Sequence, residues 1–98
     1  MKALSPEEKE LYGRVDEILH YLWDPIRVAG IPQARGEYHA YVPQVFRLVL
    51  KNRPAEEIAE YLLGIEQNEI GLSPDPKRAL RVAEILLETR RAIVEEGL

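Results

Sequence analysis

The sequence has no cysteine among its 98 residues, and it has only one tryptophan, one phenylalanine and one methionine. The missing thiols exclude disulfides, thiol catalysis and thiolate metal sites. No stretch approaches the roughly 18 consecutive apolar residues of a membrane-spanning helix, and the N-terminal segment lacks the apolar core of a signal peptide. We therefore expect a cytoplasmic protein with no membrane contact.

Positive charge is also scarce. Thirteen Lys and Arg face seventeen Asp and Glu, which gives a net charge of -4. The basic footprint of a phosphate-backbone binder is missing, so we expect no nucleic-acid partner. A chain of this length forms one domain, here residues 1–98, and leaves little room for a deep substrate chamber. We accordingly expect no cofactor and no elaborate enzyme.

The first helix has a clear start signal. Ser5 precedes a proline at the first helical position and Glu8 three residues later, the arrangement in which both side chains cap the helix. The helix should end near Trp23, because Pro25 disfavours helical geometry at the residue before it. Its apolar positions form one predicted core stripe: Leu11, Tyr12, Val15, Ile18, Leu19, Leu22 and Trp23.

Prolines, glycines and caps divide the remaining chain. Residues 24–37 show neither helical nor alternating periodicity, which indicates a long ordered loop. Pro43 fits only the first turn of a helix, so the second helix should begin near His39 or Ala40. A third helix is predicted from Pro54 to about Ile70, and a fourth from Pro76 to about Glu96. The predicted fold class is all-α: a small four-helix array with a long loop between its first two helices.

The fourth predicted helix has two apolar faces. Together they cover about 200° of its circumference, too much for a helix at the corner of a bundle. Either this helix lies at the centre of the fold, or its second face contacts another chain, as in a homodimer. The residues of the candidate interface are Val82, Ile85, Thr89 and Ile93.

Glu66 falls within the apolar stripe of the third helix. A carboxylate directed inward needs hydrogen-bond donors, a basic partner or a raised pKa. One interpretation is that Glu66 anchors the long loop by accepting hydrogen bonds from backbone N–H groups, Trp23 or a tyrosine. The other is that it acts as a general base.

The two histidines suggest acid–base or metal chemistry only weakly. His20 and Asp24 are four residues apart, yet both project away from the core stripe and should be solvated unless the loop covers them. No metal-binding spacing or nucleophile motif is present, so we expect neither a metal nor a catalytic residue. The enzymatic alternative is a small acid–base or metal-assisted enzyme that uses Asp24, Glu37, His39 and Glu66.

Several segments resemble a known family. The sequence Trp23-Asp24-Pro25-Ile26, the pair Glu37-Tyr38, AEEIAEYLLGIE from Ala55 to Glu66 and VAEILL from Val82 to Leu87 are similar to the YugE-like family of small bacterial proteins. The resemblance covers most of the chain and implies an all-α fold with no assigned activity. Small acidic helical proteins of this kind are also similar to immunity or antitoxin proteins, which occlude a partner.

These observations favour a non-enzymatic protein-binding or regulatory module that acts by surface complementarity, either with an unidentified protein or with a second copy through the fourth helix. Its candidate binding surface is the loop with the nearby aromatic side chains. The residues of this surface are Trp23, Asp24, Pro25, Ile26, Glu37, Tyr38, Tyr41 and Glu66.

Overall fold

The computed structural model describes residues 3–24, 27, 30–69 and 74–96, and within these ranges the regular structure is entirely helical. The four α-helices are α1 (Pro6–Ile18), α2 (Val42–Leu50), α3 (Ala55–Gly64) and α4 (Pro76–Arg90). Helices α1, α3 and α4 each continue into a π-helical turn: η1 (Leu19–Trp23), η4 (Ile65–Glu69) and η5 (Arg91–Glu95). Short 3-10 turns occupy Pro32–Ala34 (η2) and His39–Tyr41 (η3). The predicted all-α class with four helices is confirmed.

The start of α1 matches its prediction. The Ser5 hydroxyl accepts from the Glu8 backbone N–H at 3.1 Å, and the Glu8 carboxylate accepts from the Ser5 N–H at 2.8 Å. Two backbone donors at the helix terminus are thereby satisfied by side chains. Pro6 occupies the first turn, where its missing N–H leaves no partner unbonded.

We expect Ser5→Ala to lower the free energy of unfolding by about 1 kcal/mol, because it removes the capping hydroxyl. Gly13→Ala in the same helix should have the opposite sign and raise stability by about 0.5–1 kcal/mol, since a Cβ there would meet nothing within 4 Å. Urea titrations followed by circular dichroism measure both. A Ser5→Ala protein as stable as the wild type would show that the capping box does not hold α1.

The other helices also begin where prolines and a capping residue predict a start. Pro43 lies in the first turn of α2, and Ala55 opens α3 directly after Pro54. The Asp75 side chain accepts from the Arg78 N–H at 3.1 Å and caps α4. Gly71, the predicted end of the third helix, lies outside the described residues.

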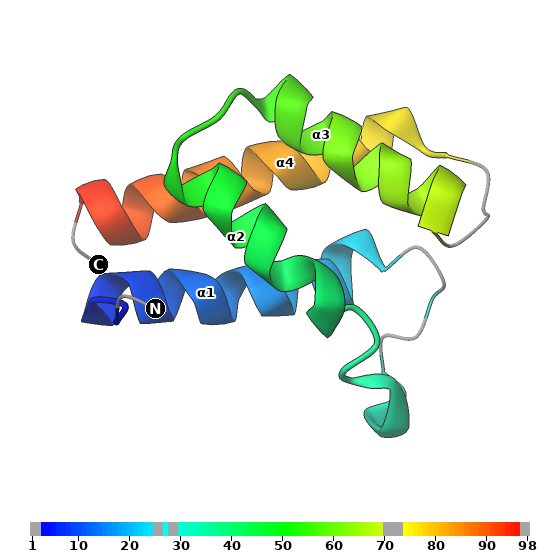
Figure 1. Cartoon of the computed structure of the whole chain (residues 1–98), viewed down its shortest axis with the longest axis horizontal. Coiled ribbons are helices and arrows are strands. Elements are labelled where there is room, and N and C mark those ends of the chain that lie inside the picture. Colours follow the sequence, from blue (N-terminus) through cyan, green and yellow to red (C-terminus); the bar gives the residue numbers. More distant parts are fainter. Residues whose placement is uncertain (1–2, 25–26, 28–29, 70–73, 97–98) are drawn as a thin grey trace.

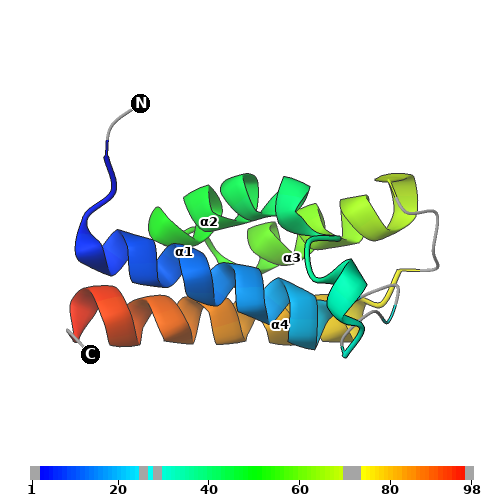
Figure 2. The same cartoon turned by 90° about the horizontal axis from the view of Figure 1, so that it is seen from below.

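Helix α4 is the central element of the fold. It contacts α3 most extensively, and it also contacts α1 and α2. Helices α1 and α4 lie side by side and run in opposite directions in both views (Figures 1 and 2). Within the described ranges, no helix has the length and apolar character needed to span a bilayer.

This central position accounts for the two apolar faces of α4, and the candidate dimer interface stays a prediction. Val82 and Ile93 are buried within the chain itself, and Ile85 and Thr89 are half-buried. The Thr89 hydroxyl donates to the Ile85 backbone carbonyl at 2.8 Å. The second apolar face of the helix is thus largely covered by its own neighbours, and these residues offer little surface to another copy.

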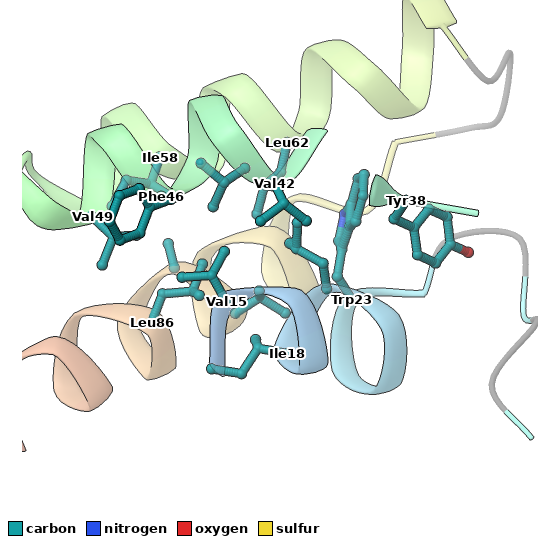
Figure 3. Close-up of a cluster of buried hydrophobic side chains, with 14 of the residues drawn as sticks. Val15, Ile18, Trp23, Tyr38, Val42, Phe46, Val49, Ile58, Leu62 and Leu86 are labelled. Carbon is teal, nitrogen blue, oxygen red and sulfur yellow. The ribbon is translucent and has the colours of Figure 1, made fainter. Parts of the chain in front are cut away.

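A cluster of aromatic side chains forms the part of the core next to η1. Trp23 is fully buried, and its ring centroid lies 5.3 Å from that of Tyr38 and 6.1 Å from that of Tyr41. Figure 3 shows Trp23 between the aliphatic core and Tyr38, whose hydroxyl points away from the core. These ring contacts therefore pack η1 against the segment just before α2.

The turn η1 affects one prediction, and the loop affects another. Leu22, expected in the core, is 49% exposed, whereas His20, expected in solvent unless the loop covers it, is only 2% exposed and shares a pocket with the loop residues Gly30, Ile31 and Arg35. The Asp24 N–H donates to the Leu19 carbonyl at 3.0 Å, a bond that spans five residues instead of four. Such a turn holds more residues than an α-helical turn, so each side chain after Leu19 points in a different direction from the one that α-helical periodicity assigns.

Candidate functional site

The connection between α1 and α2 is attached to α1 by a charged cluster. Both terminal nitrogens of Arg35 donate to the two carboxylate oxygens of Asp16 at 3.1 Å. The Nε2 atom of His39 lies 3.2 Å from Asp16 Oδ1. The hydrogen bond to Asp16 raises the pKa of Arg35, and the hydroxyl of Tyr21 adds to this effect. Arg35 consequently remains a cation at every physiological pH.

A double-mutant cycle should measure this attachment. Asp16→Asn and Arg35→Gln should each destabilise the protein modestly, with a coupling energy of about 1 kcal/mol, because the pair is bidentate but partly exposed. The matched control is Arg14 with Glu17, an exposed pair at 3.0 Å on the same helix, for which we expect about 0.3 kcal/mol. Equal coupling in the two cycles would contradict the anchoring role of Asp16.

The predicted aromatic surface assembles, but as an interior cluster. The Tyr38 hydroxyl donates to Asp24 Oδ1 at 2.7 Å, and Trp23 contacts the rings of both Tyr38 and Tyr41. Trp23 and Tyr38 are buried and Tyr41 is half-buried. These side chains therefore hold the connection in place and present little surface to a partner, and their predicted role in binding stays a prediction.

The structure describes only some of the other residues of that predicted surface. Glu37 is exposed. Pro25 and Ile26 lie outside the described residues, so their part of the prediction stays a prediction. Within the described part of the connection, Asp24 and Arg27 adopt positive φ angles of 32° and 57°, and the Arg27 N–H donates to the Asp24 carbonyl at 3.1 Å.

Glu66 is a hydrogen-bond acceptor at the junction of three elements. Its side chain is buried, with 4% of the residue exposed. The indole N–H of Trp23 donates to Oε2 at 3.1 Å, and the Asp75 backbone N–H donates to Oε1 at 3.2 Å. The predicted acceptance from Trp23 is confirmed, and the anchored segments are η1 and the residue before α4.

The groups of the enzymatic alternative are held by different partners. Asp24 accepts from Tyr38, His39 contacts Asp16, and Glu66 accepts from Trp23 and Asp75. No group of three or more His, Asp or Glu side chains among the described residues is arranged to hold a metal ion. Asp24, His39 and Glu66 therefore contact different partners, and among the described residues they do not form one common site.

Sequence periodicity misses a different surface, formed where α1 ends. Tyr21, Leu22 and Ile31 are 54%, 49% and 46% exposed, the highest values among the large apolar side chains in the described part of the chain. The guanidinium carbon of Arg35 lies 5.5 Å from the centroid of the Tyr21 ring. We call Tyr21, Leu22, Ile31 and Arg35 the η1 surface. In the sequence, the signal for it is Tyr21, which falls near the edge of the core stripe, where tyrosines often mark contact surfaces.

A pocket of about 440 Å³ opens on this surface, lined by His20, Tyr21, Gly30, Ile31 and Arg35. The His20 ring lies edge-on to Tyr21 at a centroid distance of 4.5 Å. Its Nδ1 atom is buried and has no hydrogen-bond partner. Because buried polar atoms are nearly always bonded, this imidazole is the most unusual polar group of the site.

Comparison of the chain with models of protein families, with curated proteins and with solved structures finds no match. The resemblance to the YugE-like family therefore stays a prediction.

Proposed function

We propose that this protein is a non-enzymatic binding module that recognises another protein through the η1 surface. The observation that carries the proposal is the exposure of Tyr21, Leu22 and Ile31, of which Tyr21 and Ile31 line one pocket. Tyrosine and arginine are enriched among the residues that dominate binding energy, and burying an exposed aliphatic group adds a hydrophobic contribution.

The rest of the site supports binding more than catalysis. Three of the candidate acids and bases, Asp24, His39 and Glu66, are engaged in contacts that fix the chain. These bonds hold the α1–α2 connection against the helices, and a preorganised surface loses less conformational entropy on binding. An immunity or antitoxin type of action, in which the protein covers a partner's surface, is one form that such binding would take.

The test begins with partners that co-purify from the source cells and are identified by mass spectrometry. Calorimetry with the purified partner should then show that Ile31→Asp weakens binding at least about tenfold, since it places a charge in an apolar contact. The control is Val94→Asp. Val94 is also an exposed apolar residue, but it lies in η5, at the opposite end of the bundle from η1 (Figure 1).

Wild-type affinity for Ile31→Asp, or an equal loss for Val94→Asp, would contradict the proposal. Light scattering over a range of protein concentrations tests whether the surface instead binds a second copy of this chain. A dimer that Ile31→Asp dissociates would show that the surface binds a second copy of the chain instead of another protein.

A further inference from the structure

A second pocket, of about 390 Å³, lies between α3, η4 and the last residue of η3. Among the described residues, it shares no lining residue with the pocket of the η1 surface. Tyr41 and Tyr61 are half-buried, whereas Glu60 is exposed. A Cβ added to Gly64 would meet nothing within 4 Å, so the backbone borders open space there. The residues that line this pocket are Tyr41, Glu60, Tyr61, Gly64, Ile65 and Asn68.

The charge around this pocket is negative. Residues 55–69, which form α3 and η4, include five glutamates and neither lysine nor arginine. Glu57 is paired with Arg53, whereas Glu60 has no ion-pair partner within the described part of the chain. The pocket also lies beside the last helical turns of this segment, where backbone carbonyls carry partial negative charge. A group that binds here should therefore be a cation.

The side chains of the lining indicate which kind of cation fits. A metal ion would require several carboxylate or carbonyl ligands, and the described lining residues include one carboxylate. Two tyrosine rings favour an organic cation instead, which the ring electrons attract. A guanidinium fits best, because it is planar, stacks on aromatic rings and pairs with a carboxylate through two N–H groups. The amide oxygen of Asn68 is a further acceptor, and Ile65 offers apolar contact to an aliphatic stem.

We infer that this pocket binds an arginine side chain of a partner polypeptide, with the guanidinium against Tyr41 and Tyr61 and paired with Glu60. Glu60 and Asn68 are both exposed, so the pocket is open to solvent on that side. It would hold one side chain but would not enclose most of a free small molecule, as small-molecule sites do. The inference does not depend on the η1 surface, because different residues form the two pockets.

The experiment is an NMR titration of the whole chain with arginine blocked as its N-acetyl methylamide. The backbone amide signals of Tyr61 and Gly64 should shift to saturation, with a dissociation constant of about 10 mM or below. The equivalent citrulline compound has a similar shape but no charge. It should bind at least about tenfold more weakly, since it loses both the ion pair and the attraction to the rings. Equal binding of the two compounds, or no saturable shift at Gly64, would overturn the inference.

Two variants test the site. Glu60→Gln removes the charge with little change of shape and should weaken binding of the arginine compound at least about fivefold. The matched control is Glu56→Gln, at an exposed position of the same helix outside the lining, which should bind as the wild type does. Gly64→Leu should fill the pocket and abolish binding without lowering stability, because glycine is a poor helix former.

Equal losses for the two glutamate variants would indicate a diffuse effect of charge. Wild-type binding by Gly64→Leu would place the arginine compound elsewhere on the protein. Either result would overturn the inference.

Two further results identify the source of the cation and separate the two proposals. Methylguanidinium that binds as tightly as the arginine compound would show a site for a small free cation and overturn the assignment to a polypeptide side chain. A natural partner whose affinity falls with Ile31→Asp but not with Glu60→Gln would overturn this inference and leave the proposed function intact. A partner that responds only to Glu60→Gln would support this inference and contradict the role of the η1 surface.

Discussion

Trp23→Ala is expected to lower the free energy of unfolding by about 3–5 kcal/mol, the range for truncation of a buried aromatic side chain. Trp23 is fully buried, contacts the rings of Tyr38 and Tyr41, and donates to Glu66. Because a small domain is stable by only about 5–15 kcal/mol, this variant should be partly unfolded under mild conditions.

Two comparisons make the result specific. Tyr21→Ala removes an aromatic ring that is 54% exposed and sits two residues away, so it should change stability by no more than about 0.5 kcal/mol. Trp23→Phe keeps an aromatic ring but loses the indole donor, and should cost about 1–2 kcal/mol. Urea midpoints measure all three variants. Similar midpoints for Trp23→Ala and Tyr21→Ala would show that the tryptophan does not anchor the core.

Glu66→Leu should be the second most damaging substitution, at about 2–3 kcal/mol. It removes the acceptor of two donors, the Trp23 indole N–H and the Asp75 backbone N–H. Glu66→Gln keeps one carbonyl oxygen but directs an amide NH2 toward the other donor, so its cost should be smaller, about 1 kcal/mol. Glu60→Leu, at an exposed site of the same helix, should stay within about 0.5 kcal/mol.

The double variant Trp23→Phe with Glu66→Leu tests the pairing itself. Removing donor and acceptor together leaves only the Asp75 N–H without its partner, so the loss of stability should be smaller than the sum of the two single losses. Calorimetric unfolding of the four proteins in the cycle gives the coupling. Strict additivity would show that the contact between Trp23 and Glu66 does not stabilise the fold.

Local signals in the sequence were sufficient for most of the helix boundaries. The caps at Ser5 and Asp75 and the prolines at positions 6, 43 and 76 each depend on a few neighbouring residues and on simple stereochemistry. Such signals act within one turn of the chain, so no knowledge of tertiary contacts is needed to interpret them. The buried position of Glu66 followed similarly from helical periodicity, and a buried carboxylate requires donors.

The η1 surface could not be predicted in the same way. Periodicity assumes a constant angle per residue, and the bond from the Asp24 N–H to the Leu19 carbonyl breaks that assumption at the end of α1. The exposure of Leu22 follows from this turn, whereas buried His20 lies beside the loop residues Gly30, Ile31 and Arg35. For α4, the two apolar faces are compatible with a central helix and with an interface, and only the tertiary contacts, which place α4 at the centre, distinguish the two.

The stability of His20→Phe tests most directly whether the wall of the η1 pocket is free of a structural role. The free protein carries an unbonded Nδ1 of His20 at a cost, and phenylalanine should remove that cost while keeping the ring contact with Tyr21. The account predicts a urea midpoint above that of the wild type, equivalent to about 1 kcal/mol. A variant that is less stable by 1 kcal/mol or more, at about the cost of an ordinary core substitution, would show that His20 supports the fold and would contradict the account.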